Sequence, residues 1–181
     1  TPRRGVPESN RVSVCETFRL VLRTLPAGAA TFIVALLNDP DWLRFIGDRK
    51  VRTRGDAVRY IADGPQAMRA RHGFALDAVV RKADGATMGL CGLIKRDNLD
   101  DVDLGFAFLP AYRRAGYARQ AAQAALDHGE RAFALARVAA ITSPDNVRSI
   151  RLLESLGFVF QRTIAPKPGD PDTNFYLRTR G

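Results

Sequence analysis

A strand that ends at a proline and leads through a short basic loop into a long helix constrains this fold more than any other feature. Residues 102–109 read as a strand that stops at Pro110, and residues 116–135 repeat small and apolar side chains every three or four positions. The loop between them is Arg113-Arg114-Ala115-Gly116-Tyr117-Ala118. Backbone N–H groups converge in such a loop, and the helix N-terminus adds a partial positive charge. The segment therefore predicts a site for a diphosphate.

The residue types in this loop suit that role. Gly116 lets the backbone approach a ligand without a Cβ, and Ala118 keeps the first helical turn narrow. Arg113 and Arg114 can add charge-assisted hydrogen bonds. An ordinary strand-to-helix turn can hold the same residues, so the loop alone leaves both interpretations open. A P-loop motif and a G-x-G-x-x-G motif after a strand are both absent, which excludes a P-loop NTPase and a Rossmann dehydrogenase.

Strand and helix periods alternate along the rest of the chain. The expected strands are residues 17–25, 74–82, 87–95, 102–109, 138–141, 158–162 and 174–178, and the expected helices are 27–38, 56–72, 116–135 and one that ends at Leu156. Asp84-Gly85 predicts a hairpin turn, Gly64-Pro65 an interruption of the second helix, and Asp145 or Asn146 an N-cap. These elements predict an α/β (α+β) fold in which helices flank a mostly antiparallel sheet of about seven strands.

Length and cysteine content narrow the class of protein. At 181 residues we expect one domain over residues 16–181, preceded by a flexible leader over residues 1–15. No apolar run approaches the ~20 residues that span a bilayer, and the first ten residues lack the apolar core of a secretory signal. The isolated Cys15 and Cys91, with two histidines, motivate neither a disulfide nor a metal site. We expect a cytoplasmic protein without a membrane partner.

The net charge of +9 favours an anionic partner, such as a nucleic acid, a membrane surface or a polyanionic cofactor. A general preference for arginine in the proteome explains the same charge. The arginines are scattered, and the chain has no zinc module, aromatic stacking pattern or concentrated basic helix. This distribution argues against a nucleic-acid partner.

The loop resembles a known acyl-CoA signature. R-R-A-G-Y-A is similar to the [QR]-x-x-G-x-[GA] pyrophosphate motif of the GNAT N-acetyltransferase superfamily. T-F-R-L-V-L-R-T-L, D-L-G-F-A-F-L-P-A-Y-R-R-A-G-Y-A and N-V-R-S-I-R-L-L-E-S-L-G-F follow in the order of the RimJ/RimL-type branch, the ribosomal-protein N-terminal acetyltransferases and their relatives. The resemblance covers residues 16–178, nearly the whole chain. It implies a GNAT fold and acetyl-CoA (coenzyme A) as co-substrate, without a metal.

The resemblance also assigns cofactor-binding residues. In this family the strand before the signature splays from its neighbour to receive the pantetheine arm, so the backbone of Phe108 and Leu109 is expected to pair with the pantetheine amides. The pyrophosphate is expected on the amides of Arg114, Ala115, Gly116, Tyr117 and Ala118, with Arg113 beside them. Asn146 matches a residue that hydrogen-bonds the pantetheine arm, and Ser149 completes N-x-x-S. Asn146 can instead, or in addition, cap the helix, and Ser149 can be an ordinary exposed serine.

The implied chemistry is direct attack of a substrate amine on the thioester, which needs a base. Relatives often place a carboxylate on the strand before the signature, and Asp103 matches that position, acting through water. A solvated aspartate at a strand edge is the alternative interpretation of Asp103. Asp77, Glu154 and Tyr176 are further candidates for the acid–base chemistry.

The proton donor for the leaving thiolate is a departure from the family pattern. Many members carry a tyrosine four residues before the glycine of L-G-F, where this chain has Leu153. Ser149 is then the candidate catalytic donor, with Tyr117, Tyr176 or a water molecule as alternatives.

Three functions compete at this point. The first is an acetyl-CoA-dependent N-acetyltransferase that acts on a primary amine of a small molecule or a protein N-terminus, and whose relatives commonly form homodimers. The second is a catalytically weak GNAT-like domain that binds acyl-CoA as a regulatory ligand. The third is a basic nucleic-acid-binding domain.

Overall fold

An eight-stranded mixed sheet forms the centre of the computed structural model, which describes residues 12–165 and 167–180. The strands are β1 (Ser13–Glu16), β2 (Leu20–Arg23), β3 (Leu76–Arg81), β4 (Thr87–Ile94), β5 (Asp103–Phe108), β6 (Arg137–Thr142), β7 (Val159–Ile164) and β8 (Thr173–Thr179). Their order across the sheet is β1-β2-β3-β4-β5-β6-β8-β7. Neighbours are antiparallel except for β5 and β6, which run parallel. The predicted α/β, mostly antiparallel architecture is confirmed.

The sheet has one more strand than the sequence predicts. β1 pairs with β2 through backbone hydrogen bonds. The four residues of β1 alternate too weakly between polar and apolar side chains to predict a strand from the sequence. Residues 13–15, which are the last three of the expected leader of residues 1–15, therefore belong to β1. Residues 1–11 of that leader lie outside the described residues.

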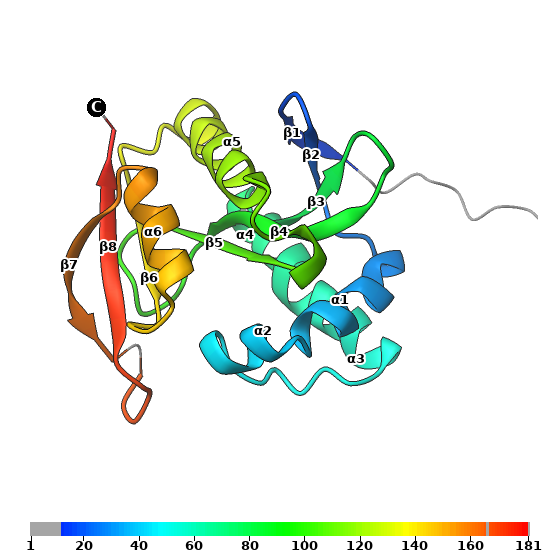
Figure 1. The fold of residues 1–181 in the computed structure, drawn as a ribbon, viewed down its shortest axis with the longest axis horizontal. Coiled ribbons are helices and arrows are strands. Elements are labelled where there is room, and N and C mark those ends of the chain that lie inside the picture. Colours follow the sequence, from blue (N-terminus) through cyan, green and yellow to red (C-terminus); the bar gives the residue numbers. More distant parts are fainter. Residues whose placement is uncertain (1–11, 166, 181) are drawn as a thin grey trace, which may run out of the picture.

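Helices cover both faces of the sheet (Figure 1). They are α1 (Ala30–Leu37), α2 (Pro40–Phe45), α3 (Arg54–Ile61), α4 (Ala67–His72), α5 (Tyr117–Phe133) and α6 (Val147–Ser155), with short 3-10 turns at Ala27–Ala29 and Pro110–Tyr112. Buried residues of α1, α2 and α3 pack with β3 and β4 on one face. Those of α5 and α6 join the core on the other face. None of the helices in the described part of the chain is long and apolar enough to cross a membrane.

Two local predictions are confirmed in the segments between these elements. The helix predicted over residues 56–72 changes to a π-helical segment, Ala62–Gln66, around Pro65, which has no N–H for the regular ladder. The hairpin between β3 and β4 turns at Gly85, whose φ of 71° lies in the left-handed region that glycine adopts without strain.

Small residues set how closely α5 approaches the sheet. Ala121, Ala122 and Ala125 of α5 are buried, and a Cβ on Gly129 would lie 2.7 Å from the Leu93 side chain of β4. Because α5 packs closely on β4 and β5, the first turn of α5 lies next to the end of β5. The predicted anion loop therefore lies where β5 stops.

The parallel strands β5 and β6 diverge along their length. They pair only at Asp103 and Ala139, with a hydrogen bond of 2.8 Å from the Ala139 N–H to the Val102 carbonyl. The rest of β5 faces β6 without a ladder between them. This opening matches the splayed strand pair that the resemblance to the GNAT superfamily implies.

Candidate active site

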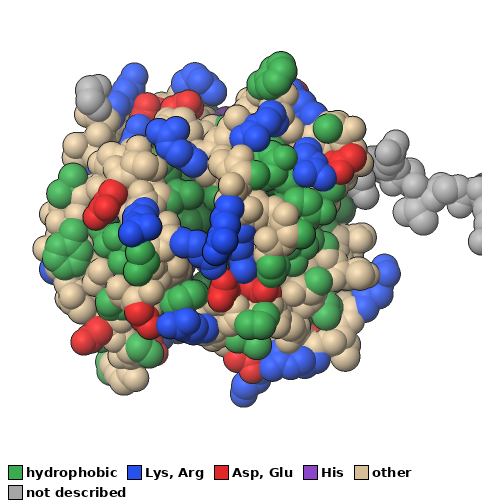
Figure 2. All heavy atoms as spheres, in the orientation of Figure 1, with side chains coloured by type: hydrophobic (Ala, Val, Ile, Leu, Met, Phe, Trp, Pro, Cys, Tyr) green, Lys and Arg blue, Asp and Glu red, His purple; other side chains and the backbone are tan. Residues whose placement is uncertain are grey.

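A cavity of about 930 Å³ opens where β5 and β6 diverge. Its walls come from β5, the loop after it, the first turns of α5 and α6, and the segment from α1 to α4. The predicted site residues that line it are Asp103, Phe108, Arg113, Arg114, Gly116, Tyr117, Ala118, Asn146 and Ser149, whereas Leu109 and Ala115 do not. Figure 2, in the orientation of Figure 1, shows basic side chains gathered near the middle of the visible face of the molecule, with acidic side chains beside them.

The loop after β5 presents backbone donors without acceptors. The N–H groups of Gly116, Tyr117, Ala118 and Arg119 have no hydrogen-bond acceptor among the described residues. No side chain within the described part of the chain caps the start of α5, and the first turn of this helix holds no acidic residue. Gly116 has a φ of 79° and Arg114 a φ of 67°, so the loop is held in a left-handed conformation that is costly for arginine. Free amides at the start of a 17-residue helix fit a diphosphate.

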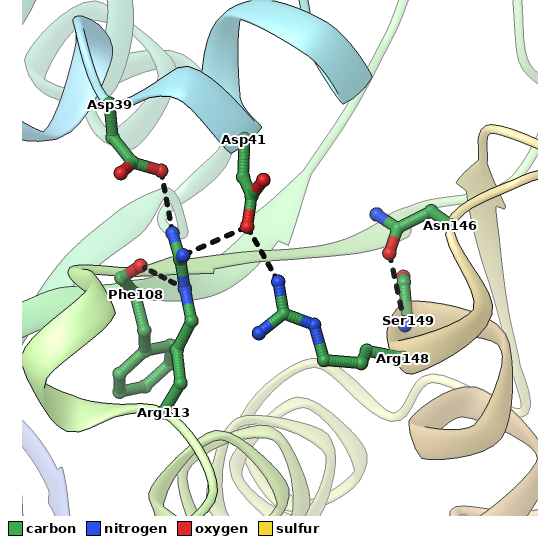
Figure 3. Close-up of polar contacts among 7 residues, drawn as sticks. All are labelled: Asp39, Asp41, Phe108, Arg113, Asn146, Arg148 and Ser149. Carbon is green, nitrogen blue, oxygen red and sulfur yellow. Dashed lines mark hydrogen bonds and ion pairs between the residues drawn. The ribbon is translucent and has the colours of Figure 1, made fainter.

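Arg113, predicted beside the phosphate, lines the cavity and also makes contacts within the protein that the sequence does not predict (Figure 3). Its Nη2 lies 2.6 Å from Asp39 Oδ2, its Nη1 lies 2.9 Å from Asp41 Oδ2, and its Nε donates to the Phe108 carbonyl at 3.0 Å. All three nitrogens of this guanidinium are therefore engaged within the protein. Arg114 is exposed at the cavity, makes no ion pair with the described residues, and is the arginine of this loop that stays available to a phosphate.

The backbone of Leu109, predicted to pair with the pantetheine arm, has partners within the protein. Its N–H donates to the Met88 carbonyl at 2.9 Å, and its own carbonyl accepts from Tyr112 N–H at 3.0 Å. Both backbone groups are thus engaged. Because bonding sides alternate along an antiparallel strand, Phe106 and Phe108 turn their backbone groups away from β4 toward the opening. The Phe108 carbonyl is taken by Arg113, so the backbone groups left at the opening are those of Phe106 and the N–H of Phe108.

The start of α6 provides the opposite wall. Asn146 is the N-cap, and its Oδ1 accepts from Ser149 N–H at 3.3 Å. Its amide Nδ2 and the Ser149 hydroxyl have no partner among the described residues, although both residues line the cavity. Asn146 can therefore cap the helix and still donate to a ligand. Ser149 is half-buried, not the ordinary exposed serine of the alternative interpretation.

Asp103 is buried, which rules out a solvated aspartate at a strand edge. It is 1% exposed, and its Oδ2 accepts from Arg96 Nε at 3.0 Å. Its Oδ1 has no hydrogen-bond partner among the described residues. Burial raises the pKa of Asp103 above its ordinary value, against the lowering effect of Arg96. A carboxylate with one engaged and one free oxygen at a cavity has the properties of a general base.

The other acid–base candidates lie outside the cavity lining. Asp77 of β3 forms an ion pair with Arg69 of α4, and Glu154 is an exposed residue of α6. Tyr176 is buried in β8, where its hydroxyl accepts from Asn174 Nδ2 at 3.4 Å. Leu153, at the position where relatives carry tyrosine, is buried and lines the cavity.

Sequence reasoning missed the residues that hold the loop in place. Asp39 and Asp41 are recognisable in the sequence only as part of a helix stop, Asn38-Asp39-Pro40-Asp41. Arg19 donates from Nη1 to the Ala115 carbonyl at 3.2 Å, and its guanidinium lies 4.5 Å from the centre of the Tyr117 ring. Nothing near Arg19 in the sequence signals this contact.

Comparison with known proteins agrees with the fold. The Acetyltransferase (GNAT) domain family matches residues 19–159. The chain is 25% identical over 169 residues to the uncharacterized N-acetyltransferase YoaA of Bacillus subtilis (strain 168), covering 90% of this chain and 94% of YoaA.

Two solved structures share the architecture. RimL, a ribosomal L7/L12 alpha-N-protein acetyltransferase, is similar with a TM-score of 0.80 at 14% identity, covering 97% of this chain and 99% of RimL. The microcin C7 self-immunity acetyltransferase MccE, in complex with acetyl-CoA and AMP, has a TM-score of 0.77 at 13% identity, covering 95% and 97% of the two chains. With most of the chain matched by the domain family, this protein belongs to the GNAT acetyltransferase family.

Proposed function

We propose that this protein transfers an acetyl group from acetyl-CoA to a primary amine. The observation that carries the proposal is the set of backbone donors from Gly116 to Arg119, which have no acceptor among the described residues and lie on the same cavity as the β5–β6 opening and Asp103. Free amides at a helix start suit a pyrophosphate, and an unpaired strand edge suits the amides of a pantetheine arm. The complex of MccE with acetyl-CoA and AMP supports the same ligand, because MccE shares this fold.

The reaction follows from these groups. The amine nitrogen attacks the thioester carbonyl carbon, a C–N bond forms, and the C–S bond breaks to release the thiolate of coenzyme A. Because Asp103 is buried beneath the cavity, the proton of the amine reaches its Oδ1 through a water molecule. Arg96 holds Oδ2, which keeps the other oxygen free for this transfer.

Ser149 supplies the proton to the thiolate in this proposal. Its hydroxyl is unengaged among the described residues and lines the cavity. Tyr117 lines the cavity as well, but its hydroxyl accepts from Arg81 Nη1 at 3.4 Å and its ring lies against Arg19. Exchange of protons with water returns Ser149 and Asp103 to their starting states, and the products are an amide and free coenzyme A.

A catalytically weak acyl-CoA-binding domain is the second candidate. The observation that favours it is Leu153, an apolar residue at the cavity where relatives carry the tyrosine donor. The two candidates differ in turnover. A panel of amines with acetyl-CoA, followed by release of free thiol, should give amine-dependent thiol production. Binding of acetyl-CoA by calorimetry without thiol release from any amine would favour the regulatory domain.

We further propose that the protein belongs to the RimJ/RimL-type branch of the family. The support is the resemblance of three segments in order and the full-length similarity of fold to RimL. The acceptor proposed on this basis is a protein N-terminus or a small-molecule amine. The panel should therefore contain both short peptides and free amines.

A further inference from the structure

Asp41 joins the two walls of the opening between β5 and β6. Its Oδ2 accepts from Arg113 Nη1 at 2.9 Å and from Arg148 Nη2 at 2.5 Å (Figure 3). Arg113 follows β5 and also donates to the carbonyl of Phe108, the last residue of that strand. Arg148 lies in the first turn of α6, which follows β6. One carboxylate oxygen thus connects the end of β5 to the helix after β6.

This connection bridges the two sides of the opening at the end where β5 and β6 have no backbone pairing. β5 and β6 are held together at Asp103 and Ala139, at the start of β5. At the other end of β5, the chain of contacts runs from Phe108 through Arg113 and Asp41 to Arg148. The width of the opening is therefore set by backbone pairing at one end and by an ionic connection at the other.

A second ion pair links the same elements with the charges reversed. Arg44 of α2 lies 3.6 Å from Asp145, which immediately precedes the N-cap of α6. Asp41 and Arg44 thus place an acid and a base on α2 opposite a base and an acid at the start of α6. Two pairs of opposite polarity fix how α2 sits against α6 better than a single pair does.

The two arginine side chains that form ion pairs with Asp41 differ in their exposure to solvent. The Arg113 side chain is 21% exposed, and it is also held by the buried Asp39. The Arg148 side chain is 51% exposed, and Asp41 is its one ion-pair partner within the described range. Water and salt therefore weaken the Asp41–Arg148 ion pair more than the Asp41–Arg113 ion pair. The Asp41–Arg148 ion pair is the one that breaks first.

We propose that Asp41 is a positioning residue that holds the β5–β6 opening at its working width, and that the Asp41–Arg148 ion pair restrains release of the bound coenzyme. The inference rests on the proposed function, because the ligand in the opening is acetyl-CoA. Asp41 acts through Arg113 and Arg148 and takes no part in the chemical step. Breaking the connection should therefore speed dissociation of the coenzyme without altering how the reaction rate depends on pH.

The test is the rate constant for dissociation of acetyl-CoA, measured by stopped flow on the full chain. Arg148→Gln should raise it about two- to five-fold, the effect of losing one exposed ion pair. Asp41→Asn should raise it about ten-fold, because both charge-assisted contacts weaken. Arg148→Lys keeps the charge and should restore a rate near that of the unaltered protein. The pH profile of kcat should be the same in all of these proteins.

Salt and a matched control separate this role from general destabilisation. Near 1 M salt the difference between Arg148→Gln and the unaltered protein should shrink, because screening removes the same ion pair. Arg137→Gln breaks an exposed ion pair with Asp101 away from the cavity and should leave dissociation unchanged.

Unchanged dissociation in both Asp41→Asn and Arg148→Gln would overturn the inference and leave the proposed function standing. Equal effects of Arg148→Lys and Arg148→Gln would overturn it as well. Failure of the unaltered protein to bind acetyl-CoA would overturn both.

Discussion

Asp103 and Arg96 form an ion pair at the cavity in which Arg96 Nε lies 3.0 Å from Asp103 Oδ2, while Asp103 Oδ1 has no partner among the described residues. The pair gives one carboxylate oxygen a fixed partner and leaves the other for chemistry. Burial of Asp103 at the same time disfavours its charged form and raises its pKa. Its acid–base behaviour should therefore be visible in the pH dependence of the reaction.

Asp103→Asn should lower kcat/KM by about 10²–10⁴-fold, the usual contribution of a general base. Because the base acts in its deprotonated form, kcat/KM of the unaltered enzyme should rise with pH through the raised pKa of Asp103. That limb should disappear in Asp103→Asn. Asp100→Asn, an exposed aspartate near the same strand that does not line the cavity, should behave like the unaltered enzyme. A rising limb with the same midpoint in Asp103→Asn as in the unaltered enzyme would show that another group is the base.

Ser149→Ala should lower kcat without weakening acetyl-CoA binding in proportion, because the hydroxyl is proposed to act on the leaving thiolate. A loss of about 10²-fold is expected for removal of a proton donor. Ser155→Ala, which alters an exposed serine at the end of the same helix, is the matched control and should keep the full rate. Equal kcat in Ser149→Ala and Ser155→Ala would show that Ser149 is not the proton donor.

Asp39 should matter for stability more than an exposed acidic residue does. It is buried, and its ion pair with Arg113 anchors the loop before α5 to the turn between α1 and α2. Asp39→Asn should lower the free energy of unfolding by about 1–3 kcal/mol, the range for a buried hydrogen bond to a charged group. Arg59→Gln removes an exposed ion pair with Asp56 and should cost under about 1 kcal/mol. Urea denaturation of the two variants compares them, and equal losses would contradict this account.

Asp77 should make stability depend on pH in the weakly acidic range. Burial, only partly offset by Arg69, raises its pKa from 3.8 to about 6. Between these values the native state binds more protons than the unfolded state, so the free energy of unfolding falls as pH rises. The fall should be on the order of 3 kcal/mol and should be absent in Asp77→Asn. Asp97→Asn, on an exposed loop, should keep the slope of the unaltered protein, and an unchanged slope in Asp77→Asn would contradict the assignment.

Features that depend on neighbouring residues could be predicted from the sequence. The hairpin at Gly85, the π-helical interruption at Pro65 and the N-cap at Asn146 follow from the conformational preferences of those residues. The cavity also brings together Gly116, Asn146 and Asp103 from three separate elements, as the order of the segments indicates. Local chemistry and element order together were sufficient for the mostly antiparallel sheet, except for its edge strand β1.

Features that depend on distant residues could not be predicted. Asp39 and Arg113 are separated by 74 residues, and no local pattern shows that a guanidinium expected at a phosphate is engaged by carboxylates. The engagement of Leu109 follows from which side of β5 pairs with β4, a matter of register that one misplaced residue reverses. Burial of Asp103 likewise depends on Arg96 and the sheet around it, whereas the adjacent acidic turn suggested exposure.

In the proposed function, the loop amides before and within the first turn of α5 bind acetyl-CoA. Gly116 and Gly85 form a matched pair for testing it, because both have left-handed φ values, 79° and 71°, and neither has a neighbour that would clash with a Cβ. A β-branched side chain strains both turns equally, but only Gly116 lies at the cavity.

Calorimetric titration of acetyl-CoA into the unaltered protein, Gly116→Val and Gly85→Val measures whether these amides hold the coenzyme. We predict that the unaltered protein and Gly85→Val bind with similar Kd, and that Gly116→Val binds at least about ten-fold more weakly while still unfolding cooperatively. A Kd for Gly116→Val equal to that of Gly85→Val would contradict the assignment of this loop as the pyrophosphate site.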